Sequence, residues 1–243
     1  MNRLSLLPLI LAGLSPAATG EEYTVYFQQG TKAASLVSQL APLRAAVPQA
    51  ECRYVVLDTT ADTMAKAINS ANALKAGVDE LPSLVIGDAQ GAYAAIPLPR
   101  LSAESLQAAQ AAATAPDREQ KARKRNYEAQ QYLLFARMAL IQPLEGDTLQ
   151  QCLSSCRALM NHPFATPEDK QRLGFKCLYP LLLREYTNMY QGAHTPASEA
   201  KFLEAISALE AARDLDRNSA IGKQAFAERE RLRKARRQAR TME

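Results

Sequence analysis

The chain has 243 residues, of which 47% are apolar and 22% charged, and its formal net charge is +4. This length suits one large domain or two modest ones, and the apolar share is sufficient for a sizeable core. Tryptophan is absent and the only histidines are His162 and His194. This composition excludes histidine-rich metal sites, and it removes the usual aromatic platforms for bases or sugars.

The first twenty residues have the composition of a secretory signal peptide. Arg3 precedes an apolar run from Leu4 to Leu14 that is too short for a stable membrane anchor. Small residues up to Gly20 then form a cleavage site. We therefore expect a protein without a transmembrane segment that is cleaved after Gly20 and is periplasmic or secreted, from a bacterial cell. An uncleaved anchor is the alternative.

After the signal peptide, the net charge and the hydrophobic periodicity of the sequence change near Ala112 to Pro116. Residues 21–115 carry a net charge of −3 and alternate strand and helix signals, whereas residues 116–243 carry +6 and show helical periodicity alone. We predict an α/β domain at 21–115 and an all-α domain at 117–243.

The predicted order of elements in the first domain is βαβαββα. Short β-branched and aromatic runs predict strands at 23–27 and 53–57, and a hairpin is expected at 83–87 and 92–96. Alternation of this kind predicts a sheet with helices on its faces.

Three helices are expected between and after these strands. Thr31, Thr60 and Ser102 are their predicted N-caps, and Gly77 is the expected end of the second helix. The apolar faces that should be buried are Leu36, Leu40 and Leu43 in the first helix, Met64, Ile68, Ala71 and Leu74 in the second, and Leu106 and Ala109 in the third.

The segment Gly77–Gly91 is the most informative stretch of this domain. It contains a helix end, a Leu81-Pro82 corner, a buried strand and an Asp-x-x-Gly turn. In that order it resembles the second half of a thioredoxin-like domain, and the resemblance extends over residues 22–113. It implies that Leu81–Pro82 is cis and faces the family's active site at the start of the first helix.

The family's Cys-x-x-Cys pair is missing. Its two positions fall near Lys32 and Ser35, whose side chains cannot exchange a disulfide. Ser35 also lacks a histidine base in this domain, so both residues are interpreted as ordinary helix-start positions. The resemblance then implies a groove beside Leu81 and Pro82 that binds extended peptide through backbone groups. The lone Cys52 is interpreted as a core residue.

The second domain shows helical signals throughout. A long helix is expected from Asp117 to about Ile141, and another opens at Asp147 or Thr148. Thr166 and Thr195, each followed by proline, predict two further helix starts. Pro180 lies inside a helical pattern and should kink it.

Residues 202–218 resemble the second helix of a tetratricopeptide repeat (TPR), with small alanines for close packing and Arg217 where that family has proline. A weaker match at 147–161 lies about 53 residues away instead of the family's 34. The resemblance implies degenerate antiparallel α-hairpins, and a generic helical bundle is the alternative.

Three cysteines lie in this half, and an exported chain favours a disulfide over free thiols. If helices 147–161 and 167–179 pack antiparallel, Cys177 lies level with Cys152, and Cys156 is offset by about one turn, or about 6 Å. We predict Cys152–Cys177, with Cys156–Cys177 second and reduced core thiols as the remaining possibility.

The C-terminal helix is rich in basic residues. Arg233, Lys234, Arg236 and Arg237 could contact an anionic partner, although cations are also favoured at any helix C-terminus.

Together these patterns predict an exported, redox-inactive thioredoxin-like protein that serves as a protein-binding or scaffold module in the cell envelope. No catalytic residue, cofactor, metal or nucleic acid is expected. The partner is a protein or peptide of unknown identity. The alternatives are a thiol-disulfide oxidoreductase or chaperone that uses Cys152, Cys156 and Cys177, and an assembly protein whose basic tail docks on an anionic polymer.

Overall fold

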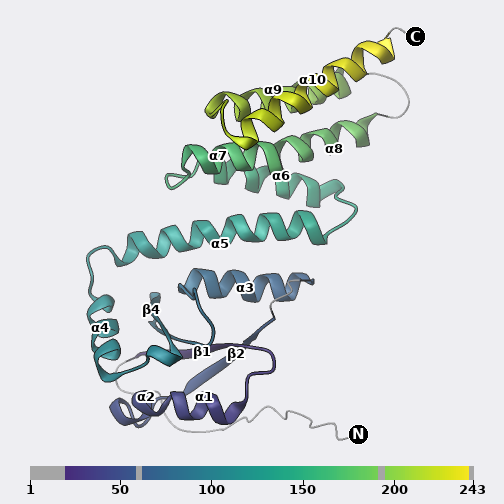
Figure 1. Ribbon diagram of the computed structural model, residues 1–243. Coiled ribbons are helices and arrows are strands. Elements are labelled where there is room, and N and C mark those ends of the chain that lie inside the picture. Colours follow the sequence, from purple (N-terminus) through teal and green to yellow (C-terminus); the bar gives the residue numbers. More distant parts are fainter. Residues whose placement is uncertain (1–19, 59–61, 191–194, 241–243) are drawn as a thin grey trace, which may run out of the picture. The chain divides into compact units, whose positions relative to one another are not determined.

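The computed structural model describes residues 20–58, 62–190 and 195–240, with side chains up to residue 238 (Figure 1). The predicted signal peptide and its apolar run lie outside these residues. The chain forms two compact units. We call residues 20–56 and 78–118 the sheet unit, and residues 57–77 and 119–240 the helical unit. The second helix of the predicted α/β domain groups with the helical unit.

The sheet unit is built on a mixed four-stranded sheet with the order β2-β1-β3-β4. Its strands are β1 Glu22–Gln28, β2 Cys52–Leu57, β3 Ser83–Asp88 and β4 Gly91–Pro97. β3 is antiparallel to both β1 and β4. The first five residues of β3 are buried, as expected for a central strand rich in apolar residues.

The β3–β4 hairpin forms at the predicted Asp-x-x-Gly turn. Gly91 has a φ of +108°, a conformation that disfavours side chains. The Asp88 carboxylate accepts the Gln90 N–H at 2.8 Å, so the turn is held by its own side chain. The guanidinium of Arg118 lies 2.6 Å from the same carboxylate.

The helices of the sheet unit are α1 Ala33–Gln39, α2 Ala41–Ala46 and α4 Ala103–Ala113, with a 3-10 turn, η1, at Leu98–Arg100. Their core side chains are the predicted Leu36, Leu40, Leu43, Leu106 and Ala109, which pack with Val25, Leu84 and Ile86 of the sheet. The predicted Ser102 cap is confirmed, with a reciprocal bond to Ser105. The Thr31 cap is wrong. Its hydroxyl donates to the Gln28 carbonyl at 2.7 Å, and Lys32 is the N-cap.

The first segment of the helical unit is α3, Met64–Ala76. Thr60 lies outside the described residues, and Thr63 provides the cap by accepting the Lys66 N–H. The predicted buried face is wrong in part. Ile68 is 46% exposed, and the buried side chains are Ala67, Ala71, Ala73 and Ala76. Small alanines allow close approach of another element, so they define the inner face here instead of the larger residues. Gly77 ends the helix as predicted, with a φ of +83°.

The remaining helices are α5 Arg118–Leu140, α6 Gly146–Met160, α7 Pro167–Leu173, α8 Tyr179–Met189, α9 Pro196–Leu215 and α10 Ala220–Arg240. α8 packs against α9, and α9 against α10 (Figure 1). The predicted caps Thr166 and Thr195 are both confirmed, each within a reciprocal capping box. No helix within the described residues is long and apolar enough to cross a bilayer.

The distortion expected at Pro180 takes the form of a π turn, η2, at Gly174–Leu178. The Tyr179 N–H donates to the Gly174 carbonyl, five residues back. Because Pro180 has no N–H and its ring opposes the preceding turn, the chain widens there before α8 continues. Gly174 also approaches α9, since a Cβ on it would lie 3.4 Å from the Cβ of Ala212.

The α9–α10 corner is held by a small set of polar bonds. The Asp216 carboxylate accepts the N–H groups of Asn218 and Ser219, and the Ser219 hydroxyl accepts the Gly222 N–H at 2.9 Å. A Cβ at Gly222 would overlap the Asp216 carbonyl oxygen. The corner therefore leaves no room for a side chain at residue 222.

The buried Gln171 connects α7 to this corner. Its side-chain N–H group donates to the carbonyls of Ala212 and Asp216 at 2.9 and 2.8 Å, and its oxygen accepts from the Ser219 hydroxyl. Gln171 is 3% exposed. One side-chain amide thus forms hydrogen bonds with polar groups at the end of α9 and just before the start of α10.

Candidate functional site

The register of the sheet brings the residues of the predicted groove to one end. Tyr26 of β1 pairs with Ser83 of β3. β1 leads from this end towards the start of α1, and β3 begins here directly after Pro82. The Leu81–Pro82 peptide bond is cis, as the resemblance implied. The helix start and the proline corner therefore belong to the same end of the sheet.

The four predicted groove residues differ in their accessibility. Leu81 is 37% exposed, Pro82 is half-buried, and Lys32 and Ser35 are exposed. The Pro82 carbonyl accepts the Leu98 N–H at 2.8 Å, which fixes the corner to η1. The Ser35 N–H donates to the Lys32 carbonyl at 3.0 Å, so these two residues form the first turn of α1. This end offers an exposed leucine, an amine and a hydroxyl, and none of the four is a cysteine.

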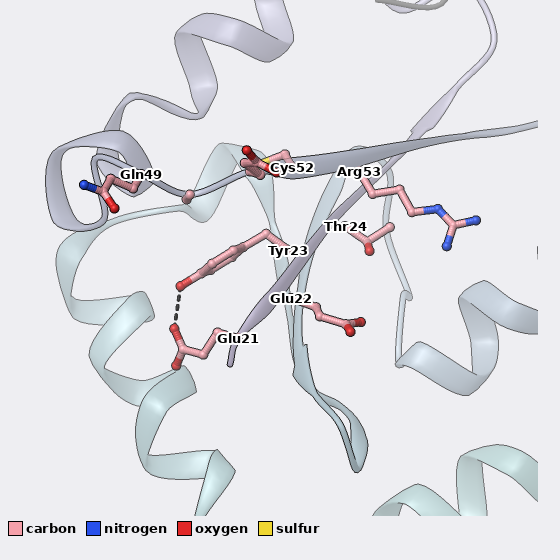
Figure 2. A pocket seen from close by; sticks show the side chains of 9 residues that line it. Glu21, Glu22, Tyr23, Thr24, Gln49, Cys52 and Arg53 are labelled. Carbon is pink, nitrogen blue, oxygen red and sulfur yellow. Dashed lines mark hydrogen bonds between the residues drawn. The ribbon is translucent and has the colours of Figure 1, made fainter. Parts of the chain in front are cut away.

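A pocket of about 500 Å³ lies at the other end of the same sheet (Figure 2). It is lined by the start of β1 and by the segment that enters β2, residues Glu21, Glu22, Tyr23, Thr24, Gln49, Ala50, Glu51, Cys52 and Arg53. Glu22 pairs with Gly87, next to the hairpin turn, whereas the proline corner adjoins Tyr26. The pocket is therefore separate from the predicted groove.

Glu21 organises one side of this pocket. Its carboxylate accepts the hydroxyl protons of Tyr23, at 2.5 Å, and of Tyr93, at 2.9 Å (Figure 2 shows the bond to Tyr23). Burial, and then the hydrogen bond to Glu21, raise the pKa of both phenols above their ordinary value. Both tyrosines therefore stay neutral donors at physiological pH and hold the carboxylate in place.

Cys52 is the only thiol that lines this pocket. It is half-buried and packs against the core of the sheet unit. Burial raises the pKa of Cys52, and nearby Arg44 opposes this shift to a smaller extent. A raised pKa disfavours the thiolate, which is the nucleophilic form. The interpretation of Cys52 as a core residue agrees with this position.

Sequence reasoning missed this pocket because its parts are remote in the chain. Glu21 and Tyr93 lie 72 residues apart, and a glutamate just before a strand carries no local signal. The short β-branched and aromatic run at 23–27 predicted the strand but not the polar contact at its start.

The three cysteines of the helical unit lie in its core. Cys152 and Cys156 of α6 and Cys177 of η2 are each 0% exposed and are free thiols in the structure. Burial and contact with Cys156 raise the pKa of Cys177, the contact being the larger cause. The predicted Cys152–Cys177 bond stays a prediction.

The four basic residues predicted to meet an anionic partner lie on α10. Arg233 is 2.8 Å from Glu210, and Arg236 pairs with Glu199 and lies over the ring of Phe202. The Arg237 Nε donates to the Arg233 carbonyl at 3.4 Å, and Lys234 is exposed. Two of these four cations are thus engaged by acids of α9.

Within the residues that the structure describes, no group of three or more His, Cys, Asp and Glu side chains could hold a metal ion. No protein-family profile, curated protein or solved structure matches the chain. The interpretation of the sites therefore depends on their geometry and chemistry alone.

Proposed function

We propose that the chain is an exported, redox-inactive thioredoxin-like protein that binds extended segments of other proteins at the end of its sheet next to Leu81 and Pro82. The observation that carries this proposal is the pairing of Tyr26 with Ser83, which brings the start of α1 and the proline corner together. The strand order β2-β1-β3-β4 and the antiparallel β3–β4 hairpin support a thioredoxin-like sheet.

Binding fits this end of the sheet better than catalysis does. An extended segment needs backbone partners and a shallow apolar contact, and Leu81 is partly exposed beside the corner. A nucleophile would need an adjacent base, and the sheet unit contains no histidine to activate Ser35. The position of the family's first cysteine falls near Lys32, whose side chain cannot exchange disulfides.

The helical unit is proposed to be a degenerate TPR-like module that supports the same role. α9 carries buried Ala205, Ala208 and Ala212, which permit close packing of neighbouring helices. α9 and α10 lie side by side around the corner at Asp216, as the two arms of a helical hairpin do. Stacked hairpins present extended surfaces to proteins.

The test is binding of the mature chain, residues 21–243, to an array of random decapeptides. We expect selective binding, and Leu81→Asp should weaken it at least about tenfold, because a charge replaces an apolar contact. Ile68→Asp is the matched control, since Ile68 is 46% exposed on α3. No selective binding, or equal loss from both variants, would contradict the proposal. Circular dichroism of each variant establishes that the fold is retained.

The alternative of a thiol-disulfide oxidoreductase is disfavoured by the burial of its sulfurs. An enzyme of this kind needs an accessible thiolate, and Cys152, Cys156 and Cys177 are each 0% exposed. Turnover in an insulin-reduction assay would overturn this judgement.

Export itself predicts that the protein recovered from the cell envelope begins at Glu21, which N-terminal sequencing measures.

A further inference from the structure

The three buried thiols of the helical unit do not have equivalent surroundings. Cys152 and Cys156 lie one turn apart on α6, and Cys177 lies in the π turn η2. All three belong to the same core, together with Leu149, Leu153 and Leu173. Their neighbours decide which two sulfurs can join.

Cys177 lies close to Cys156. The Cys156 thiol is the largest of the influences that raise the pKa of Cys177. The Cys156 thiol in turn donates to the Leu173 carbonyl at 3.8 Å. Cys156 therefore faces the α7–η2 segment, which carries Cys177.

Cys152 has a different partner. Burial raises the pKa of its thiol, and the nearby Arg137 cation on α5 opposes that rise. Among the charges that act on the pKa of Cys177, Cys152 has a smaller influence than Cys156 and Arg172. Cys152 is thus influenced by Arg137 of α5, whereas Cys177 is influenced mainly by Cys156.

The π turn explains why counting residues favours a different pair. Counting outward from the α6–α7 connection assumes two regular helices, which sets Cys177 level with Cys152. The widened turn at Gly174–Leu178 changes the rotation of the chain before Cys177 is reached. A regular helix would direct residue 177 elsewhere.

We propose that Cys156 and Cys177 form a disulfide when the chain folds under oxidising conditions, and that Cys52 and Cys152 stay thiols. Both S–H bonds break and one S–S bond forms. The two electrons and two protons pass to a small disulfide oxidant, such as glutathione disulfide, which is reduced to two thiol molecules. Because both sulfurs are 0% exposed, the exchange precedes closure of the core. The folded core then shields the bond from reductants.

The test starts from the reduced, unfolded mature chain, residues 21–243, refolded in a glutathione redox buffer. After denaturation and alkylation we expect two of the four cysteines to be modified, Cys52 and Cys152. Trypsin should release residues 138–157 joined to residues 177–184. Fragmentation between Cys152 and Cys156 then identifies the sulfur that is bonded. Four modified cysteines, or a bond at Cys152, would overturn the proposal.

Two matched variants sharpen the assignment. Cys152→Ala should keep the disulfide, leaving Cys52 as the single alkylated residue, whereas Cys156→Ala should leave its three remaining cysteines alkylated. The reverse pattern would assign the bond to Cys152 and overturn the proposal. Should a variant fail to fold, the fragment spectrum of the unaltered chain decides alone. The measurement requires neither export nor peptide binding, so its result is independent of the proposed function.

Discussion

The sheet unit and the helical unit hold their polar groups in different places. In the sheet unit, charged groups lie at the rim, where Glu21 binds two tyrosine hydroxyls and Asp88 binds Arg118. In the helical unit, uncharged polar groups lie in the core, where Gln171 is 3% and the three thiols are 0% exposed. Rim charges respond to pH and salt, whereas buried amides respond to the loss of a partner. Loss of a partner of the buried amide should therefore lower stability more than loss of a charge at the rim of the sheet.

Gly222→Ala should have the largest effect on the helical unit. The new Cβ would overlap the Asp216 carbonyl oxygen and lie 3.1 Å from the Arg217 Cα, so the corner must move. We expect a loss of about 3 kcal/mol in the free energy of unfolding, measured by urea denaturation. Gly174→Ala is the control, because its Cβ would make an ordinary contact with Ala212. Equal losses would show that the corner adapts.

Gln171→Leu should have the next largest effect. The substitution removes the side-chain donor of the buried Ala212 carbonyl and one of the two donors of the Asp216 carbonyl, and it leaves the Ser219 hydroxyl with the Asp216 carbonyl as its acceptor. We expect a loss of about 2 kcal/mol, since unsatisfied buried groups bear their full desolvation cost. Gln150→Leu is the control, because that amide bonds to Glu185 at an exposed position. A similar midpoint for both variants would contradict the importance of the buried amide.

Asp88→Asn tests the rim of the sheet unit through pH. Hydrogen bonds from the Arg118 guanidinium hold the pKa of Asp88 below its usual range. A folded pKa below the unfolded value of about 3.9 gives stability that is present above that pH and lost as pH falls through the folded pKa.

We therefore expect Tm to fall more steeply in acid for the unaltered chain than for Asp88→Asn. At neutral pH the variant should lose less than about 1 kcal/mol, because the pair is partly solvated. The control is Glu119→Gln, which removes an exposed carboxylate paired with Arg123. If Tm falls equally with pH in Asp88→Asn and Glu119→Gln, the pH sensitivity does not come from Asp88 at the rim of the sheet unit.

Arg233→Ala should have the smallest effect. Arg233 and Glu210 form a partly exposed pair at 2.8 Å, and such pairs contribute about 0.5 kcal/mol or less. The loss should shrink further in high salt, because screening weakens the pair in the unaltered chain. Lys234→Ala on the same helix is the comparison. A loss that persists in high salt would mean that packing of the arginine stem, not charge, supports α10.

Local signals predicted much of the secondary structure. Ser102, Thr166 and Thr195 cap helices because a hydroxyl three residues before a free backbone N–H is sufficient to bond it. The end of α3 at Gly77 and the hairpin turn at Gly91 were equally local, since each depends on one glycine with positive φ.

The failures have different causes. Thr31 is chemically able to cap α1, but its hydroxyl donates to the Gln28 carbonyl three residues back, so a competing local acceptor decides the outcome. The inner face of α3 was predicted only in part: Ala71 is buried as expected, but the sequence favours large residues such as Ile68, whereas the structure also buries Ala67 and Ala73. At the candidate groove, the family resemblance implied that the proline corner faces the start of α1, and the register of β1 and β3 brings both to one end of the sheet.

The corner between α9 and α10 also has an evolutionary consequence. Asp216, Ser219 and Gly222 follow one another at intervals of three residues, and each has a separate role in the turn. The Asp216 carboxylate accepts the Ser219 N–H, the Ser219 hydroxyl accepts the Gly222 N–H, and Gly222 leaves the space that a side chain would fill. A related protein that keeps this bend must also keep glycine at the third position, whereas its exposed residues can change. The spacing Asp-x-x-Ser-x-x-Gly is thus a compact signature by which divergent kin of this chain should be recognisable.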